Sequence, residues 1–313
     1  MNVGLIDVDG HNFPSLPLMK IASWHHSQGN SISWYSPWAA DRLLPYDKVY
    51  MSKVFSFTPD YPCEVKAKEI IRGGSGYCIE LENGVEVYHS ERDTSLPYEV
   101  EHAYPAYWLY GITDTAYGFL SRGCPRGCDF CHVKSKEGTI SHKVADLSEF
   151  WRGQPNICLS DPNILACPDW KDLFGQLKES KAKVDFNQGL DVRLCTEEKI
   201  YAINSINLNK HIHMAWDRHQ DNLEVHFRRF AKYYRRSTSS VMVYVLVNFG
   251  STIEEDLYRI YTLRDLGFQP FVMLYDKEHA DQIHKDLARW CDNKYIFKSC
   301  KRFEDYKPTR KEK

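Results

Sequence analysis

The apolar positions of the first hundred residues alternate between strand-like and helix-like spacing. Val3–Asp7 is a short apolar run that ends in a polar loop, as expected for a buried strand. From about Ser15 the apolar residues recur at helical spacing, and Gly29 is placed to end that helix. Further strands are expected at residues 31–35 and 47–57. This strand–helix–strand order predicts a parallel sheet with a right-handed crossover.

A glycine-rich turn and a hairpin complete this first region. A strand near residue 70 runs into Gly73-Gly74, and residues 80–87 fit a hairpin whose turn is predicted at Asn83-Gly84. Residues 91–105 are polar and contain two prolines, so we expect a linker there. The pattern therefore predicts a small Rossmann-like α/β domain over residues 1–100.

Beyond this linker, apolar strands and amphipathic helices alternate along the chain. Strands are predicted at residues 116–120, 156–160, 183–187, 211–216, 241–247 and 270–275. Helices are expected between them at residues 144–151, 170–180, 222–234 and 253–266. Parallel strands that are apolar on both faces are typical of β/α barrels. We therefore predict a partial (β/α)6 TIM-like barrel over residues 106–300 and a basic tail over 301–313, with functional groups at the carboxyl ends of the strands.

The composition narrows the class of protein. Hydrophobic residues make up 43% of the 313 residues and charged residues 26%, which indicates a folded globular chain. Lys+Arg is 40 against Asp+Glu 42, which excludes a uniformly basic nucleic-acid coat but not a local basic patch. No apolar stretch reaches the roughly 18 residues of a membrane span. The first residues lack the pattern of a secretion signal, so we expect a cytoplasmic protein with no membrane partner.

Ten cysteines in such a chain indicate metal or redox chemistry rather than disulfides. Seven are scattered, and we expect these to be small buried hydrophobic residues. Cys124, Cys128 and Cys131 instead lie together, directly after the first predicted barrel strand. Three thiolates at this spacing can hold three irons of a [4Fe–4S] cluster and leave the fourth iron open for chemistry. Gly123 and Gly127 suit a tight loop around a bulky cluster.

The segment that carries these cysteines resembles the signature of the radical S-adenosylmethionine superfamily. It reads Cys124-x3-Cys128-x2-Cys131, with the aromatic Phe130 before the last cysteine. The flanking residues are similar to those of the branches with an N-terminal cobalamin-binding domain and of the methylthiotransferases. The resemblance implies that S-adenosylmethionine chelates the open iron and is cleaved by one electron to a 5′-deoxyadenosyl radical, which abstracts hydrogen from a substrate. It also implies a flavodoxin or ferredoxin as electron donor, and it leaves the substrate open.

The resemblance further implies cofactor contacts at the strand ends. Phe130 would lie beside the adenine, and polar residues that follow the second, third and fifth barrel strands would hold S-adenosylmethionine or the substrate. These candidates are Asp161, Asn163, Asn187, Gln188, Asp191, Asn248 and Gly250. The same residue types also cap helices and form turns, so a structural role is the alternative at each position.

The resemblance also suggests cobalamin as a second cofactor to consider. Family members that bind it through histidine carry an Asp-x-His-x-x-Gly loop after the first strand. This chain has Asp9-Gly-His11 but Pro14 at the glycine position, which favours a cobalamin-binding-like domain without its cofactor. The alternative is a cobalamin-dependent radical methyltransferase with His11 as cobalt ligand. A methylthiotransferase is disfavoured because the first region lacks a second set of three cysteines.

A non-catalytic protein is the alternative from another class. Residues 228–236 combine five cations with three aromatic residues, the residue types that bind single-stranded nucleic acid, although a helix with a charged solvent face has the same composition. Zinc could occupy the three cysteines together with His132, but His132 adjoins Cys131, and joint ligation by neighbouring residues is awkward. This alternative is a metal-stabilised nucleic-acid-binding module.

Overall fold

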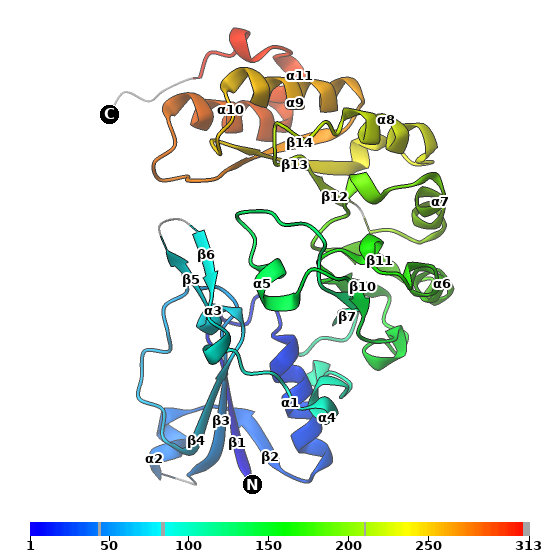
Figure 1. Cartoon of the computed structure of the whole chain (residues 1–313). Helices are drawn as coiled ribbons and strands as arrows, with labels where there is room; N and C mark the ends of the chain where they lie inside the picture. The colour runs from blue at the N-terminus through cyan, green and yellow to red at the C-terminus, as the bar shows by residue number, and fades with distance from the viewer. Residues whose placement is uncertain (43–44, 83–84, 210, 309–313) are drawn as a thin grey trace. The chain divides into compact units, whose positions relative to one another are not determined.

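The computed structural model divides into two compact units, Met1–Ile157 and Cys158–Lys313, which are described separately. The division falls inside β10 (Asn156–Leu159), away from the linker expected at residues 91–105. Parallel strands occur in both units, so the predicted mixed α/β class is confirmed (Figure 1). The structure describes residues 1–42, 45–82, 85–209 and 211–308.

The first unit alternates strands with short helices. Its strands are β1 (Asn2–Asp7), β2 (Ser31–Trp34), β3 (Tyr46–Ser52), β4 (Ala67–Gly73), β5 (Ile79–Glu82), β6 (Val85–Tyr88), β7 (Thr115–Gly118), β8 (Ser121–Arg122) and β9 (His142–Lys143). Its helices are α1 (Leu16–Ser27), α2 (Pro37–Arg42), α3 (Ser75–Cys78), α4 (Tyr98–Glu101) and α5 (Val133–Glu137), with 3-10 turns η1 (Ser90–Arg92), η2 (Tyr107–Tyr110) and η3 (Leu147–Glu149).

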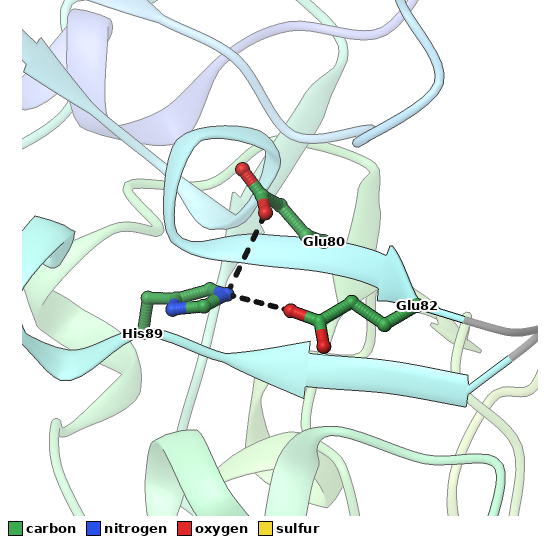
Figure 2. A group of neighbouring side chains, drawn as sticks. All are labelled: Glu80, Glu82 and His89. Atoms are coloured by element: carbon green, nitrogen blue, oxygen red, sulfur yellow. Dashed lines mark ion pairs between the residues drawn. The ribbon is translucent and has the colours of Figure 1, made fainter.

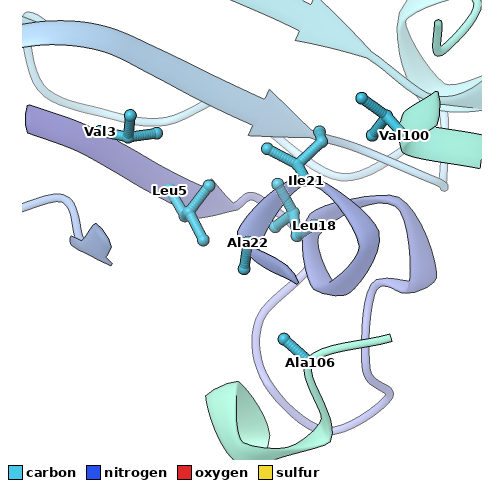
Figure 3. Packing of buried hydrophobic residues seen from close by; sticks show 7 residues of the cluster. All are labelled: Val3, Leu5, Leu18, Ile21, Ala22, Val100 and Ala106. Carbon is cyan, nitrogen blue, oxygen red and sulfur yellow. The ribbon is translucent and has the colours of Figure 1, made fainter. Parts of the chain in front are cut away.

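The main sheet of this unit has the strand order β2-β1-β3-β4, with every neighbouring pair parallel. The first strand thus lies between the second and third, and its parallel pairing with the second is what the strand–helix–strand order predicts. Figure 3 shows one core cluster, in which apolar side chains of β1 and α1 pack together with Val100 and Ala106. Val100 is buried on α4, and α4 packs on α1. Val100, within the segment expected as a linker, therefore contributes to the core, while most of residues 91–99 are exposed.

The third strand ends earlier than the expected 47–57 because a side chain accepts hydrogen bonds from the backbone that follows it. β3 ends at Ser52, and the Asp9 carboxylate then accepts hydrogen bonds from the backbone N–H groups of Val54 and Phe55. The hairpin of β5 and β6 is confirmed and antiparallel. Its predicted turn, Asn83-Gly84, lies outside the described residues.

The second unit alternates strands and longer helices. Its strands are β11 (Lys183–Phe186), β12 (Ile212–Ala215), β13 (Val241–Val247) and β14 (Gln269–Leu274). Its helices are α6 (Trp170–Ser180), α7 (Glu197–Ser205), α8 (Glu224–Tyr233), α9 (Ile253–Asp265), α10 (Gln282–Asp292) and α11 (Lys294–Ser299), with 3-10 turns η4 (Ile164–Ala166), η5 (Val192–Leu194), η6 (Thr238–Ser240) and η7 (Phe303–Asp305).

The strands predicted for a barrel form two separate three-stranded sheets. One has the order β12-β13-β14, with parallel pairs, and the other has the order β11-β10-β7. Among the described residues these strands do not form a closed barrel. The helix expected at 144–151 is wrong, because the Val144 N–H bonds the Leu120 carbonyl and Asp146 then caps a single 3-10 turn. Within the described part of the chain, no helix has the length and apolarity needed to cross a bilayer.

The central strand of the second unit shows how its sheet is covered. Along β13, buried and half-buried residues alternate, so one face is fully enclosed. Helices α9 and α10 pack against β14, and α9 also packs against β13 (Figure 1). Leu263 of α9 and Trp290 of α10 are fully buried. The other face of the sheet is left partly open within this unit.

A buried arginine ties the ends of two strands to α9. Arg259 is 0% exposed and donates to the carbonyls of Trp216 (2.7 Å), which follows β12, and Leu246 (2.9 Å) on β13. It also donates to the carbonyl of Asp217 at 3.0 Å and pairs with the buried Asp256 carboxylate. A guanidinium suits this place because its fixed fork of donors can satisfy several acceptors at once.

We predict that Arg259→Met lowers the free energy of unfolding by about 3–5 kcal/mol, because it leaves Asp256 buried without its cation. The matched control is Arg228→Met, which removes an exposed ion pair with Glu224 and should cost about 1 kcal/mol or less. Urea unfolding of both variants measures the difference. Equal losses in the two variants would contradict the role given to Arg259.

Candidate functional site

The three clustered cysteines lie on a loop that a short antiparallel ladder closes. Ser121 of β8 pairs with Lys143 of β9, and Arg122 pairs with His142. Gly123 follows at once with φ +83°, a left-handed conformation that favours glycine. A Cβ on Gly123 would lie 2.2 Å from the carbonyl oxygen of Ile140. The two ends of the loop can therefore meet only if residue 123 has no side chain.

The second glycine of the motif has a different role. Gly127 does not have a positive φ, and a Cβ there would meet only the Lys134 side chain, with Nζ at 3.7 Å. The loop backbone is held instead by two hydrogen bonds, from Cys124 N–H to Gly138 O and from Cys131 N–H to Cys128 O, both 3.1 Å. Of the two glycines expected to suit a tight loop, only Gly123 stands where a side chain would collide with the backbone.

Ion pairs hold the cysteine loop against the β5–β6 hairpin. His132 Nδ1 lies 2.6 Å from a carboxylate oxygen of Glu86, on β6. Lys136, on α5, donates to Asp93 at 3.0 Å and to the Cys78 sulfur at 3.3 Å. Burial alone would raise the pKa of Asp93, but the hydrogen bond and charge of Lys136 outweigh it and lower that pKa. The pair is thus ionised and less than one-fifth exposed, so it fixes α5 on the hairpin region.

The sulfur atoms themselves are accessible to different degrees. Cys124 and Cys128 are half-buried, and Cys131 is exposed as a residue. Neighbouring atoms still desolvate the Cys131 sulfur, which raises its pKa, and the charge of nearby Cys124 raises it further. The structure thus brings Cys124 and Cys131 near each other. The three sulfurs are not all within 4.8 Å of one another.

The donor chemistry of this loop fits a thiolate-ligated metal centre. Three sulfurs on one short, closed loop offer soft ligands. Thiolates must replace thiols when metal binds, so a raised cysteine pKa makes proton release part of that binding. The scattered cysteines differ: Cys78, Cys158, Cys167, Cys195 and Cys291 are buried as predicted, whereas Cys63 is exposed and Cys300 half-buried. Burial raises the pKa of Cys158 to about 12, which keeps it an inert thiol.

The polar residues predicted at the strand ends of the second unit fall into two groups. Asp161 and Asn163 are both 4% exposed, and the Asn163 carbonyl accepts the first bond of η4. Asn187 and Gln188 are exposed in the turn after β11, and the Asn187 N–H bonds Leu159 O at 2.9 Å. The ends of β10 and β11 are therefore adjacent, as the barrel pattern predicts.

The remaining predicted residues have mainly local contacts. Asp191 accepts hydrogen bonds from the Arg193 backbone (3.1 Å) and guanidinium (2.8 Å), and Arg193 also pairs with Asp221. Asp191 thus caps its own turn, which is the structural alternative considered for it. Asn248 and Gly250 follow β13 with φ of +62° and +73°, so both shape a turn.

Sequence reasoning missed two polar features of the second unit. Asp217 lies two residues after the end of β12, and burial raises its pKa to about 6 despite the opposing charge of Arg259. On the half-buried face of the sheet, His213 and Tyr244 stack with ring centroids 5.6 Å apart, and Asp185 is close enough to influence the pKa of both. The available signal was a set of polar residues at alternate positions inside otherwise apolar strands.

The residues at the carboxyl ends of the strands of the first sheet test whether cobalamin could bind there. In this strand order a ligand would bind where β1 and β3 diverge. Tyr110 donates to the Asp7 carboxylate at 2.7 Å, and the His11 ring packs 4.2 Å from Trp34 and 5.6 Å from Tyr110. The chain's own rings thus occupy the end of β1 beside His11. These residues do not fit a cobalamin site, and we derive no step through that cofactor.

The basic segment on α8 has mainly structural contacts. Phe230 and Tyr234 are buried, so their rings are not free to stack on bases. Arg229 donates to the Arg193 carbonyl and Arg236 to the Ile206 carbonyl. The described residues of this segment thus have the contacts of a helix with a charged solvent face.

We predict that Gly123→Ala opens the cysteine loop, because alanine is strained at positive φ and its Cβ would collide with Ile140 O. Trypsin cleavage at Arg126, Lys134 and Lys136 should become about tenfold faster or more, as opening of the loop becomes at least about 1.4 kcal/mol easier. Gly127→Ala is the control and should cleave at the wild-type rate. Similar rates for both variants would contradict this account of loop closure. Mass spectrometry of the first fragments identifies the cleaved bonds.

Comparison with known proteins adds no assignment to this geometry. No protein-family model, curated protein or solved structure matches the chain.

Proposed function

We propose that this chain is a radical S-adenosylmethionine enzyme in which Cys124, Cys128 and Cys131 hold a [4Fe–4S] cluster. When bound with S-adenosylmethionine, such a cluster supplies one electron for reductive cleavage to a 5′-deoxyadenosyl radical. The observation that carries the proposal is the cysteine loop. It holds the three cysteines between the two halves of one β ladder, and its first turn excludes any side chain at Gly123.

Two features of the loop are compatible with this role: the ionisation of its thiols and a nearby cation. Each thiol loses its proton when it ligates metal, and because the pKa of Cys131 is raised, its thiolate form depends on metal binding. The Lys134 amine lies beside the loop backbone at Gly127. A cation there would offset the negative charge of a thiolate-ligated cluster.

The finer fold description belongs to the same proposal. We take β7 and β10–β14 as the strands of a partial barrel and the first parallel sheet as a Rossmann-like domain. Phe130 is assigned to the adenine. The strand-end residues of the second unit are assigned to S-adenosylmethionine or the substrate: Asp161, Asn163, Asn187, Gln188, Asn248 and Gly250. Asp191 is given a positioning role, because its carboxylate holds the turn at η5. A flavodoxin or ferredoxin would supply the electron.

The test is anaerobic reconstitution with iron and sulfide, reduction, addition of S-adenosylmethionine and assay of 5′-deoxyadenosine. The native chain should produce it. Single replacements Cys124→Ala, Cys128→Ala and Cys131→Ala should each reduce production to background, because loss of one thiolate removes one of only three protein ligands. The matched control is Cys63→Ala, an exposed cysteine outside the loop, which should leave production unchanged.

Two results would contradict the proposal. A colourless protein that holds one zinc ion and no iron would identify a structural metal site instead. Production that survives all three cysteine replacements would place the chemistry elsewhere. Salt-sensitive binding of single-stranded nucleic acid by the zinc form would then favour the non-catalytic module.

A further inference from the structure

A second group of metal-ligating side chains lies on the β5–β6 hairpin. Glu80 and Glu82 are two residues apart on β5, so their side chains project from the same face of the strand. His89 directly follows β6, and its backbone N–H bonds the Cys78 carbonyl at 2.7 Å, which extends the ladder by one pair. All three residues thus lie on the same two-stranded hairpin.

The imidazole of His89 points between the two glutamates (Figure 2). Its Nε2 atom is 3.3 Å from Glu82 Oε1 and 3.6 Å from Glu80 Oε2. This nitrogen is shielded from solvent and makes no hydrogen bond. One ligand atom of each of the three residues lies within 4.8 Å of the ligand atoms of the other two.

Carboxylates surround both nitrogens of this imidazole. On the other side of the ring, Nδ1 lies 3.4 Å from a carboxylate oxygen of Glu91. Three acidic side chains thus face one histidine ring, and the oxygens of Glu80 and Glu82 converge on Nε2. A divalent cation between these three atoms would be attracted to both carboxylates and coordinated by the nitrogen.

The two distances from Nε2, 3.3 Å to Glu82 and 3.6 Å to Glu80, agree with a shared metal ion. Ligand atoms bound to one metal at about 2.0–2.2 Å are about 3.0–3.6 Å apart. Glu91 on Nδ1 would have the outer-shell role that carboxylates commonly have beside metal-bound histidines. Arg92 pairs with the other oxygen of Glu80, Oε1, and leaves Oε2 facing the histidine.

We propose that Glu80, Glu82 and His89 form a binding site for a divalent metal ion, with Mn²⁺ as the ion suited to two carboxylates and one imidazole. The ligands are Glu80 Oε2, Glu82 Oε1 and His89 Nε2, and water completes the shell. This site shares no residue with the cysteine loop and does not depend on the proposed function. It would stabilise the hairpin that also carries Glu86, the partner of His132.

The test uses the full chain, freed of metal by a chelator, and titrates it with Mn²⁺ while electron paramagnetic resonance measures the free ion. We expect one saturable site per chain. Glu82→Gln and His89→Gln should each weaken binding about tenfold or more, since each removes one of three protein ligands. Mn²⁺ is a hard ion that thiolates bind poorly, so the cysteine loop does not interfere.

The matched control is Glu99→Gln, which removes an equally charged, exposed side chain of the same unit and should leave the affinity unchanged. Circular dichroism verifies that each variant is folded, and Glu82→Gln keeps the test decisive if His89→Gln is not. The proposal is overturned if the native chain shows no saturable Mn²⁺ site, or if the Glu82 and Glu99 variants bind equally. The first result would leave His89 as a contact partner of the two glutamates and not as a metal ligand.

Discussion

The close approach of Gly123 to the Ile140 carbonyl is the constraint on which the candidate site depends. It allows β8 and β9 to pair immediately beside the cysteines, so that a segment of about twenty residues begins and ends at one point. Everything between these strands, including α5 and the three thiols, is positioned by that closure. A side chain at residue 123 would separate the strands and spread the thiols.

The closed loop is then fixed to the rest of its unit by polar side-chain contacts. Two contacts, His132 with Glu86 and Lys136 with Asp93, connect it to the hairpin and to the segment that follows. Partly buried pairs of this kind are directional and hold one geometry, whereas exposed pairs contribute little. The opposite face of the hairpin carries Glu80 and Glu82, so a metal ion there would stiffen the element against which the cysteine loop rests.

Much of the fold could be predicted because its signals are local. Apolar runs and glycine stops gave α1, β1 and most strands of the second half. Pairing between residues far apart in sequence could not be predicted. Residues 144–151 have apolar residues at helical spacing, but the backbone hydrogen bond from Val144 to Leu120 and the cap made by Asp146 prevent a helix. The end of β3 was missed for the same reason, since Asp9 lies far from it in sequence.

The candidate site was predictable in part for a related reason. The spacing of Cys124, Cys128 and Cys131 is a contiguous signal, and so is the glycine at 123 that was expected to allow a tight loop. The burial of Asp217 and the grouping of Glu80 with His89 depend on how the elements of each unit pair and pack. A single sequence does not show which polar residues become buried together, and turn-forming residues resemble ligands.

The proposed cluster is held by three cysteines and leaves one iron open to S-adenosylmethionine. Mössbauer spectroscopy of the protein reconstituted with ⁵⁷Fe, before and after S-adenosylmethionine is added, distinguishes that iron from the other three. We expect a [4Fe–4S] spectrum in which one iron of the four changes its isomer shift when S-adenosylmethionine binds. An unchanged spectrum, or a protein that takes up no cluster, would contradict it.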